Sequence, residues 1–285
     1  MMKPGGRLKL DSSRKISKDF CEKSFGACML VNRNLVVPDC CNQIFKVNIY
    51  SQTGDFIKKI EPKESFSKLG VCLLLSDGSF AVLDKLRIHG FDSSGDFLWN
   101  ILLPSIPSGS TRHYGLAEDS SGYLITIQEN KFSSGNDRNT YLLKYDLESK
   151  SLVEKIFVLK PVKDSKCRFL SFASEKFYVT DLGLDRVYII DPSGKIDVVG
   201  KTGVADDCFN DPAGTVVDDY GNFIIADSRN HKLALYSSDL QFVCKLVLNP
   251  PTRRPSDIFF SSDRKSLVVL HLHSTNCIEV YPLDS

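Results

Sequence analysis

The sequence lacks the features that mark several common classes of protein. Its 285 residues contain no Asn-x-Ser/Thr glycosylation site and no apolar run long enough to cross a membrane. The first residues, Met1–Gly6, have none of the apolar core of a signal peptide. These absences predict a cytoplasmic protein without a membrane partner.

The nine cysteines include no Cys-x-x-Cys pair, although structural zinc sites usually place two ligands a few residues apart. Their number is odd, and several lie in apolar runs, as Cys72 does in Gly70–Leu75. This pattern predicts buried, reduced thiols without disulfides or metal. The HExxH, P-loop and GxSxG motifs are also absent. We therefore expect no cofactor and no catalytic residues, and hence no enzyme.

What the sequence does contain is one short unit that recurs along the chain. In the clearest copy, Pro212–Tyr236, two apolar runs flank an acidic turn with Gly221, and a third run follows a polar turn. A fourth run lies at Phe242–Leu248. The second run recurs about every 44–46 residues, with one longer interval. Its copies are Asn34–Asp39, Gly78–Asp84, Gly122–Ile127, Lys176–Asp181, Gly221–Asp227 and Lys265–His271.

Four-stranded units of this length are typical of propeller blades. We predict an all-β fold, a single six-bladed β-propeller over residues 1–285 with four-stranded antiparallel blades. The sixth unit stops after its third strand, and Gly6–Leu10 resembles a fourth strand, so the N-terminal strand is expected to close the ring. The longer interval is interpreted as an inserted loop, Glu129–Asn139. The expected blades are 24–60, 69–103, 113–159, 168–200, 212–248, and 255–283 together with 6–10.

One copy of the unit, Gly221–Leu233, contains Ala-Asp-Ser-Arg-Asn-His and resembles the NHL repeat; Asp181–Val187 keeps part of the same frame. The chain is therefore similar to the NHL-repeat propellers found at the C-terminus of tripartite-motif and B-box proteins. That resemblance implies a non-catalytic platform that binds RNA or protein partners. It also implies the recruiting part of a larger ubiquitin-ligase-type protein, whose ligase activity would reside in a RING domain absent from this chain.

The near-neutral net charge of +1 gives no global attraction to nucleic acid. In a propeller, however, the loops that lead into each blade and the loops between its second and third strands share one face, the top face, and here these loops are rich in Lys and Arg. We predict that this face binds single-stranded RNA or an acidic protein segment, with aromatic rings on which bases stack and no small-molecule substrate. The predicted ligand-binding residues are Arg112, His113, Tyr114, Lys160, Lys163, Lys166, Arg168, Arg186, Arg229, Arg253, Arg254 and His273.

Other interpretations stay open at this point. The repeated Asp39, Asp84, Asp181 and Asp227 suggest a carboxylate cluster, but at equivalent places in separate blades they are expected to accept backbone N–H groups. The predicted lining of the channel mouth contains one carboxylate, Asp257, too few for a calcium or catalytic zinc site. The alternative function is a metal-dependent propeller hydrolase or lyase, and a scaffold that joins two proteins is a third.

Overall fold

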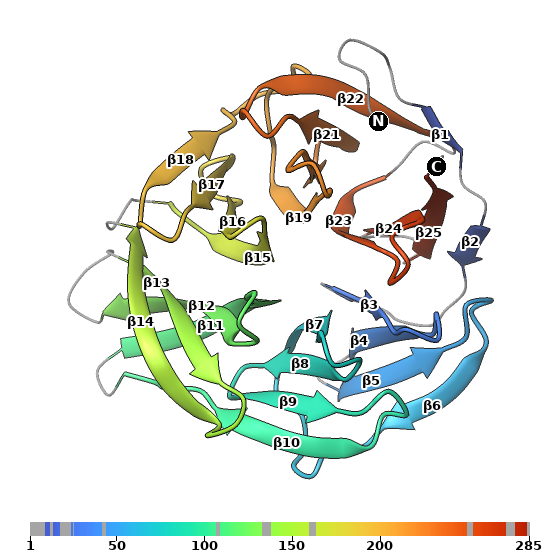
Figure 1. Cartoon of the computed structure of the whole chain (residues 1–285), viewed down its shortest axis with the longest axis vertical. Coiled ribbons are helices and arrows are strands. Elements are labelled where there is room, and N and C mark those ends of the chain that lie inside the picture. Colours follow the sequence, from blue (N-terminus) through green and yellow to red (C-terminus); the bar gives the residue numbers. More distant parts are fainter. Residues whose placement is uncertain are drawn as a thin grey trace.

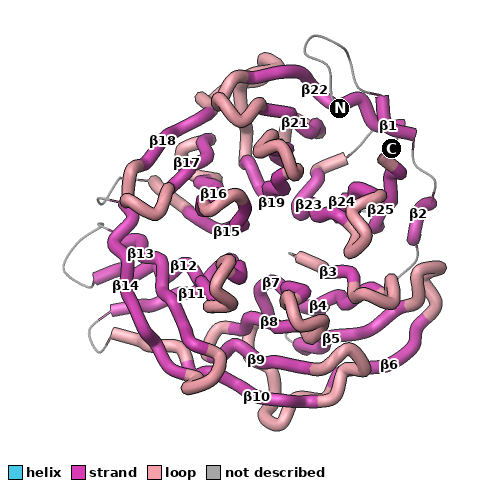
Figure 2. The backbone as a smooth tube through the Cα atoms, in the orientation of Figure 1, coloured by secondary structure: helices cyan, strands magenta, loops and turns pink. Residues whose placement is uncertain are grey.

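The computed structural model describes residues 9–11, 14–17, 24, 26–41, 44–106, 109–132, 138–159, 164–249, 253–271 and 277–283. Within these ranges the chain is all strand and loop, and the strands form six sheets arranged around a centre (Figure 1). The tube in Figure 2 shows strands joined by short loops in every blade and no helix in the described part. The predicted all-β, six-bladed propeller is confirmed. No described helix offers a membrane-spanning segment.

Each blade runs outward from an innermost first strand. The first three blades comprise β3 (Cys28–Met29), β4 (Leu35–Cys41), β5 (Ile44–Tyr50) and β6 (Phe56–Ile60); β7 (Leu69–Leu74), β8 (Phe80–Asp84), β9 (Arg87–Phe91) and β10 (Phe97–Leu102); and β11 (Gly109–Glu118), β12 (Leu124–Phe132), β13 (Arg138–Asp146) and β14 (Ser151–Leu159).

Blades four to six follow the same order. They comprise β15 (Cys167–Ala173), β16 (Lys176–Asp181), β17 (Arg186–Ile190) and β18 (Ile196–Val199); β19 (Pro212–Val217), β20 (Phe223–Asp227), β21 (Lys232–Tyr236) and β22 (Phe242–Asn249); and β23 (Pro255–Phe260), β24 (Ser266–His271), β25 (Cys277–Pro282) and β2 (Arg14–Ser17).

The acidic turns between first and second strands form because an aspartate accepts backbone N–H bonds across the turn. In blade five the Asp218 carboxylate accepts the N–H groups of Tyr220 at 2.9 Å and Asn222 at 2.8 Å. Gly221 in this turn has φ +81°, in the left-handed region that glycine adopts without a steric penalty. Turns of the same kind, with Asp77 and Gly78 and with Asp119 and Gly122, connect the first two strands of blades two and three.

The core lies between neighbouring blades. Its buried apolar residues form six clusters in the described part, and each joins two adjacent blades. The cluster that joins blade one to blade six contains Leu35 and Val37 from β4 and Val268 and Leu270 from β24. Side-chain packing therefore closes the ring in addition to strand pairing, and no blade has a core of its own.

The N-terminal segment closes blade six, but with different residues from those predicted. Strand β2 (Arg14–Ser17) pairs antiparallel with β25, and Lys9–Leu10 of the predicted closing strand 6–10 belong to β1 (Lys9–Asp11), which pairs parallel with β22 of blade five. Residues 6–8 lie outside the described part. Arg14–Ser17 contains a single apolar residue, as suits an outermost strand with one neighbour, so its pattern contains little signal.

Blade three has longer strands than the others, and the predicted inserted loop Glu129–Asn139 is strand at both of its ends, while residues 133–137 lie outside the described part. Strands β12 and β13 continue their pairing through Glu129 opposite Thr140, Asn130 opposite Asn139 and Lys131 opposite Arg138. The longer repeat interval predicted a loop over this stretch. The structure instead buries Gln128, Glu129 and Asn130 within the extended hairpin.

Candidate functional site

The top face comprises the loops that enter each blade and those between its second and third strands. Of the predicted ligand-binding residues, Lys160, Lys163 and His273 lie outside the described residues. Blade topology places the others in top-face loops or at the strand ends beside them. They are Arg112 and Tyr114 with His113 on β11, Lys166 and Arg168 at the start of β15, Arg186 on β17, Arg229 before β21, and Arg253 and Arg254 before β23.

The structure brings together Arg112, Tyr114 and Arg168 at the junction of blades three and four. The Arg168 guanidinium carbon lies 3.7 Å from the centroid of the Tyr114 ring, and Nη1 lies 3.2 Å from Oε2 of buried Glu129. A hydrogen bond with Tyr114 is the main cause that raises the pKa of Arg112, with Glu129 adding to it. Glu129 thus neutralises Arg168, and one face of the Tyr114 ring is covered.

His113 is buried and does not offer a ring to a ligand. Its Nε2 lies 2.9 Å from the carbonyl oxygen of Pro104, and burial lowers the pKa of His113 despite that hydrogen bond. The part of the RNA prediction that relies on stacking against His113 and Tyr114 therefore finds little geometric support.

Several other predicted cations are also engaged within the protein. Arg229 forms an ion pair with Asp211, and Nε of Arg186 donates to the carbonyl of Leu184 at 3.3 Å. The backbone N–H of Arg254 donates to Nδ1 of His231. The Arg254 side chain itself makes no ion pair in the described part.

After these pairs are set aside, the top face keeps a surplus of positive charge. Cations outnumber carboxylates among the described top-face side chains without an ion-pair partner. The cations are Lys63, Lys68, Lys85, Arg112, Lys166, Arg186, Arg253 and Arg254, and the carboxylates are Asp164, Asp181, Asp185, Asp206 and Asp257. Lys63, Lys68, Lys85, Arg112, Lys166 and Arg253 are exposed, so their charge is available to a partner.

The repeated aspartates are scaffold, as expected from their spacing. Oδ1 of Asp181 accepts the backbone N–H groups of Lys166, Gly183 and Leu184, and Asp227 accepts that of Asn210. Burial alone would raise the pKa of Asp84, but hydrogen bonds from His89 and three backbone N–H groups lower it to about 2. These carboxylates therefore fix the top loops and are not free to bind a ligand.

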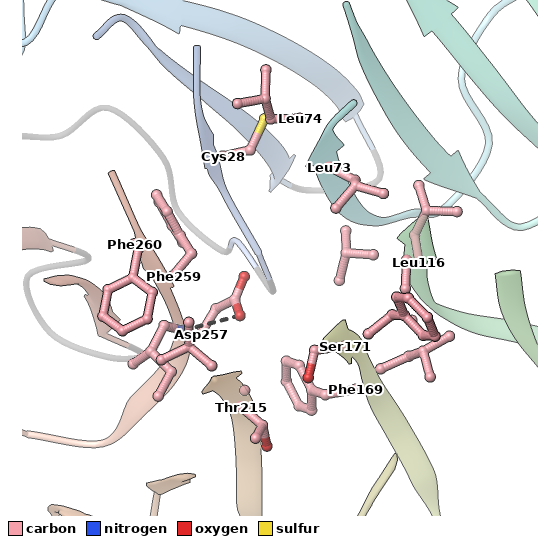
Figure 3. A pocket seen from close by; sticks show the side chains of 18 of the residues that line it. Cys28, Leu73, Leu74, Leu116, Phe169, Ser171, Thr215, Asp257, Phe259 and Phe260 are labelled. Atoms are coloured by element: carbon pink, nitrogen blue, oxygen red, sulfur yellow. Dashed lines mark hydrogen bonds between the residues drawn. The ribbon is translucent and has the colours of Figure 1, made fainter. Parts of the chain in front are cut away.

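The channel at the centre of the ring encloses a cavity of about 350 Å³, lined by the innermost strands of all six blades. Figure 3 shows the Asp257 side chain projecting from β23 toward the middle of this cavity, with Phe169 and Ser171 of β15 opposite. Ile258 donates its backbone N–H to Asp257 at 3.0 Å, and Ala27 does so at 3.4 Å. Burial raises the pKa of Asp257 to about 7, against the effect of these bonds.

The sequence predicted Asp257 at the channel mouth but missed the groups around it. Thr215 and Ser171 also line the cavity, and neither hydroxyl has a hydrogen-bond partner in the described part. Gly26 and Gly214 flank the Asp257 carboxylate, because a Cβ on them would lie 3.1 Å and 2.6 Å from its oxygens. Aligning the first strands of the six blades in the sequence would have indicated that these residues line the channel together. The described residues hold no group of three His, Cys, Asp or Glu side chains arranged for a metal ion.

Comparison with known families identifies one of the repeats. Residues 209–234 match the NHL repeat. This segment contains β19, β20 and the start of β21 in blade five, the copy whose sequence resembles the repeat most clearly. A search of curated proteins finds no match to the chain.

Solved structures with a similar fold extend over nearly the whole chain. A catalytically inactive virginiamycin B lyase from Staphylococcus aureus with quinupristin has a TM-score of 0.60 at 16% identity, covering 94% of this chain and 87% of its own. A luciferin-regenerating enzyme has a TM-score of 0.66 at 15% identity, covering 92% of each chain. Regucalcin from Agrobacterium tumefaciens, a calcium-binding protein, has a TM-score of 0.70 at 13% identity, covering 96% of this chain and 95% of its own.

These structures correct the prediction that the chain is no enzyme. That prediction relied on missing motifs and on the resemblance to binding platforms. Two of the similar propellers, the lyase and the luciferin-regenerating enzyme, are enzymes that carry catalysis on this fold. At such low identity the likeness shows the fold alone, and it makes catalysis one of the functions open to this propeller.

Proposed function

We propose that the chain is a recognition propeller that binds an acidic protein segment across its top face. The observation that supports this is the surplus of exposed cations in the top loops after internal ion pairs are removed. Lys68, Lys166 and Arg253 precede the innermost strands of blades two, four and six, so they surround the channel mouth at alternate blades. A segment with several carboxylates that crosses the mouth can contact more than one of them.

Single-stranded RNA is the second candidate, and the same cations favour it. The acidic segment is preferred because RNA recognition also draws on stacking, and the rings of His113 and Tyr114 are buried or covered on one face. The setting of a larger tripartite-motif ubiquitin ligase stays a prediction from the resemblance, since the comparison matches the NHL repeat alone.

The test is a fluorescence-anisotropy titration of a short labelled poly-glutamate peptide at low salt. Combining Lys68→Glu, Lys166→Glu and Arg253→Glu should weaken binding about tenfold or more, since each change replaces an attraction by a repulsion. These positions are chosen because their side chains are exposed and make no ion pair in the described part. Reversing Arg168 would instead leave buried Glu129 beside a second carboxylate and destabilise the fold.

Lys245→Glu is the matched control, because this exposed lysine lies on outer strand β22, away from the top loops. It should leave binding within about twofold of the original protein. Polyuridylate serves as the competitor: displacement of the peptide by RNA at a lower charge concentration would favour RNA as the ligand. If neither the peptide nor the RNA binds at low salt, the surplus charge is not a binding surface and the proposal is wrong.

A further inference from the structure

The central channel holds a second candidate site, separate from the cations of the top face. Its cavity of about 350 Å³ is at the small end of the range of about 300–1,000 Å³ that is usual for ligand pockets. Most of the lining is apolar, including Leu73, Leu116, Phe169 and Phe259, which lie around the cavity in Figure 3. An apolar wall of this kind favours a ligand with a hydrocarbon body.

Asp257 is a carboxylate of this cavity that no cation compensates and that no side chain hydrogen-bonds in the described part. Its hydrogen-bond partners in the described part are two backbone N–H groups, and no described Lys, Arg or His side chain pairs with it. Gly26 and Gly214 leave room for it, since a Cβ on Gly214 would lie 2.6 Å from Oδ1. The backbone of blades one and five thus forms a recess that fits this side chain.

The other charged groups of the lining are already engaged. Glu118 accepts the backbone N–H of Ser76 at 2.7 Å and its hydroxyl at 2.8 Å. Arg264 donates to the carbonyl of Val217 and pairs with Asp219 at 2.9 Å. Both residues lie at the far ends of first strands, away from the top face.

Two residues with hydroxyl groups also belong to the lining of the cavity. Thr215 on β19 is only 7% exposed, and its Oγ1 has no hydrogen-bond partner in the described part. The same is true of Oγ of Ser171 on β15. Both residues line the cavity with Asp257, but their hydroxyl oxygens are enclosed by the protein. Of these three polar side chains, Asp257 is therefore the one that a ligand can reach.

We propose that the central channel binds a small organic cation, an ammonium group on an apolar body, with Asp257 as its counterion. An ionised carboxylate in an apolar cavity is costly unless a positive group accompanies it, and an ammonium supplies both charge and hydrogen-bond donors. The apolar body lies against Leu116 and Phe169.

Binding should depend on pH through Asp257. Burial raises the pKa of this residue to about 7, so much of it is protonated in acid and an ammonium would then meet a neutral group. The other titratable groups that face the cavity are Cys28 on β3, Cys72 on β7, Glu118 on β11 and Arg264 after β23; β15 and β19 contribute none. Burial also raises the pKa of Cys72, well above neutrality, and the charge of Asp257 adds to this effect.

The experiment is calorimetric titration with phenethylamine and with its neutral analogue 2-phenylethanol. The amine should bind at least about tenfold more tightly than the alcohol at pH 8, and its affinity should fall about tenfold from pH 8 to pH 6 as Asp257 takes up a proton. The affinity of the alcohol should change little. The alcohol therefore separates the contribution of charge from that of the apolar walls.

Asp257→Asn keeps the shape and removes the charge, and it should abolish the preference for the amine. Asp239→Asn, at an exposed carboxylate in the turn between β21 and β22, is the control and should preserve it. Equal affinities for amine and alcohol, an amine affinity that does not change with pH, or no binding at millimolar amine would each overturn the proposal. The pH series uses the unmodified protein, so it decides the question even if Asp257→Asn does not fold. The outcome does not bear on peptide binding at the top face.

Discussion

At the scale of single residues, the same side-chain type does two different jobs on the top face. Lys166 and Lys68 are exposed and make no ion pair in the described part, whereas Lys232 is fully buried. The Lys232 ammonium donates to the carbonyls of Ala205, Asp206 and Cys208 at 2.7, 2.8 and 2.9 Å, and lies 3.5 Å from Asp227. It therefore holds the loop between β18 and β19 against blade five.

Replacing this buried lysine should cost much of the stability of the protein. Lys232→Met removes three charge-assisted hydrogen bonds and leaves Asp227 without its cation, so we expect a loss of about 3–5 kcal/mol in the free energy of unfolding. The exposed pair of Lys201 with Asp207 provides the control: Lys201→Met should change the free energy of unfolding far less, because water screens an exposed pair. Urea unfolding of both variants measures the difference, and equal losses would contradict this role of Lys232.

At the scale of elements, inner strands were predictable and outer strands were not. Every residue of β20 (Phe223–Asp227) is buried, so its apolar run and terminal aspartate repeat clearly around the ring. Outer strands such as β18 (Ile196–Val199) bury far less, and their patterns weaken accordingly. The weak apolar pattern of an outer strand is also why β2 was not predicted. The longer repeat interval of blade three was interpreted as a loop, although β12 and β13 continue their pairing into it.

The contacts between residues of different blades at the candidate sites could not be predicted from the sequence either. Asp257 could be placed in the channel by aligning first strands. Its neighbours Thr215 and Ser171 belong to other blades, and only the ring geometry brings them together. Likewise, the pairing of Arg168 with Glu129 depends on the extended hairpin of blade three, which the loop interpretation had removed.

Two N-terminal deletions should distinguish the roles of β1 and β2. Deletion of residues 1–12 removes β1, the added parallel strand of blade five, and should lower the melting temperature only modestly. Deletion of residues 1–17 also removes β2, which exposes the edge of β25 and opens blade six. It should therefore lower the melting temperature much further and promote aggregation. If the two deletions have the same melting temperature, β2 does not close the ring.

At the scale of the whole molecule, the shared cores predict that the blades unfold together. Each apolar cluster belongs to two blades, so no blade can open without exposing the core of both neighbours. The six cysteines whose side chains are described carry free thiols, and those of Cys28, Cys72 and Cys167 are buried in blades one, two and four.

These thiols provide a test of that cooperativity. Mass spectrometry after timed alkylation should show Cys28, Cys72 and Cys167 reacting at one common, slow rate set by opening of the ring. The partly exposed Cys40 and Cys244 should react sooner and serve as internal controls. Widely different rates among the three buried thiols would show that blades open separately.

The closure of the ring by β2 also sets the order in which the chain can be completed during synthesis. Arg14 pairs with Val280 and Ser17 with Cys277, so the outermost strand of blade six is synthesised before blades one to five and its partner strand after them. Until then β2 has no sheet to join, while blades one to five can form as they leave the ribosome. The nascent protein therefore passes through an open five-bladed stage with two bare blade faces, and this is the stage at which a chaperone would be needed most.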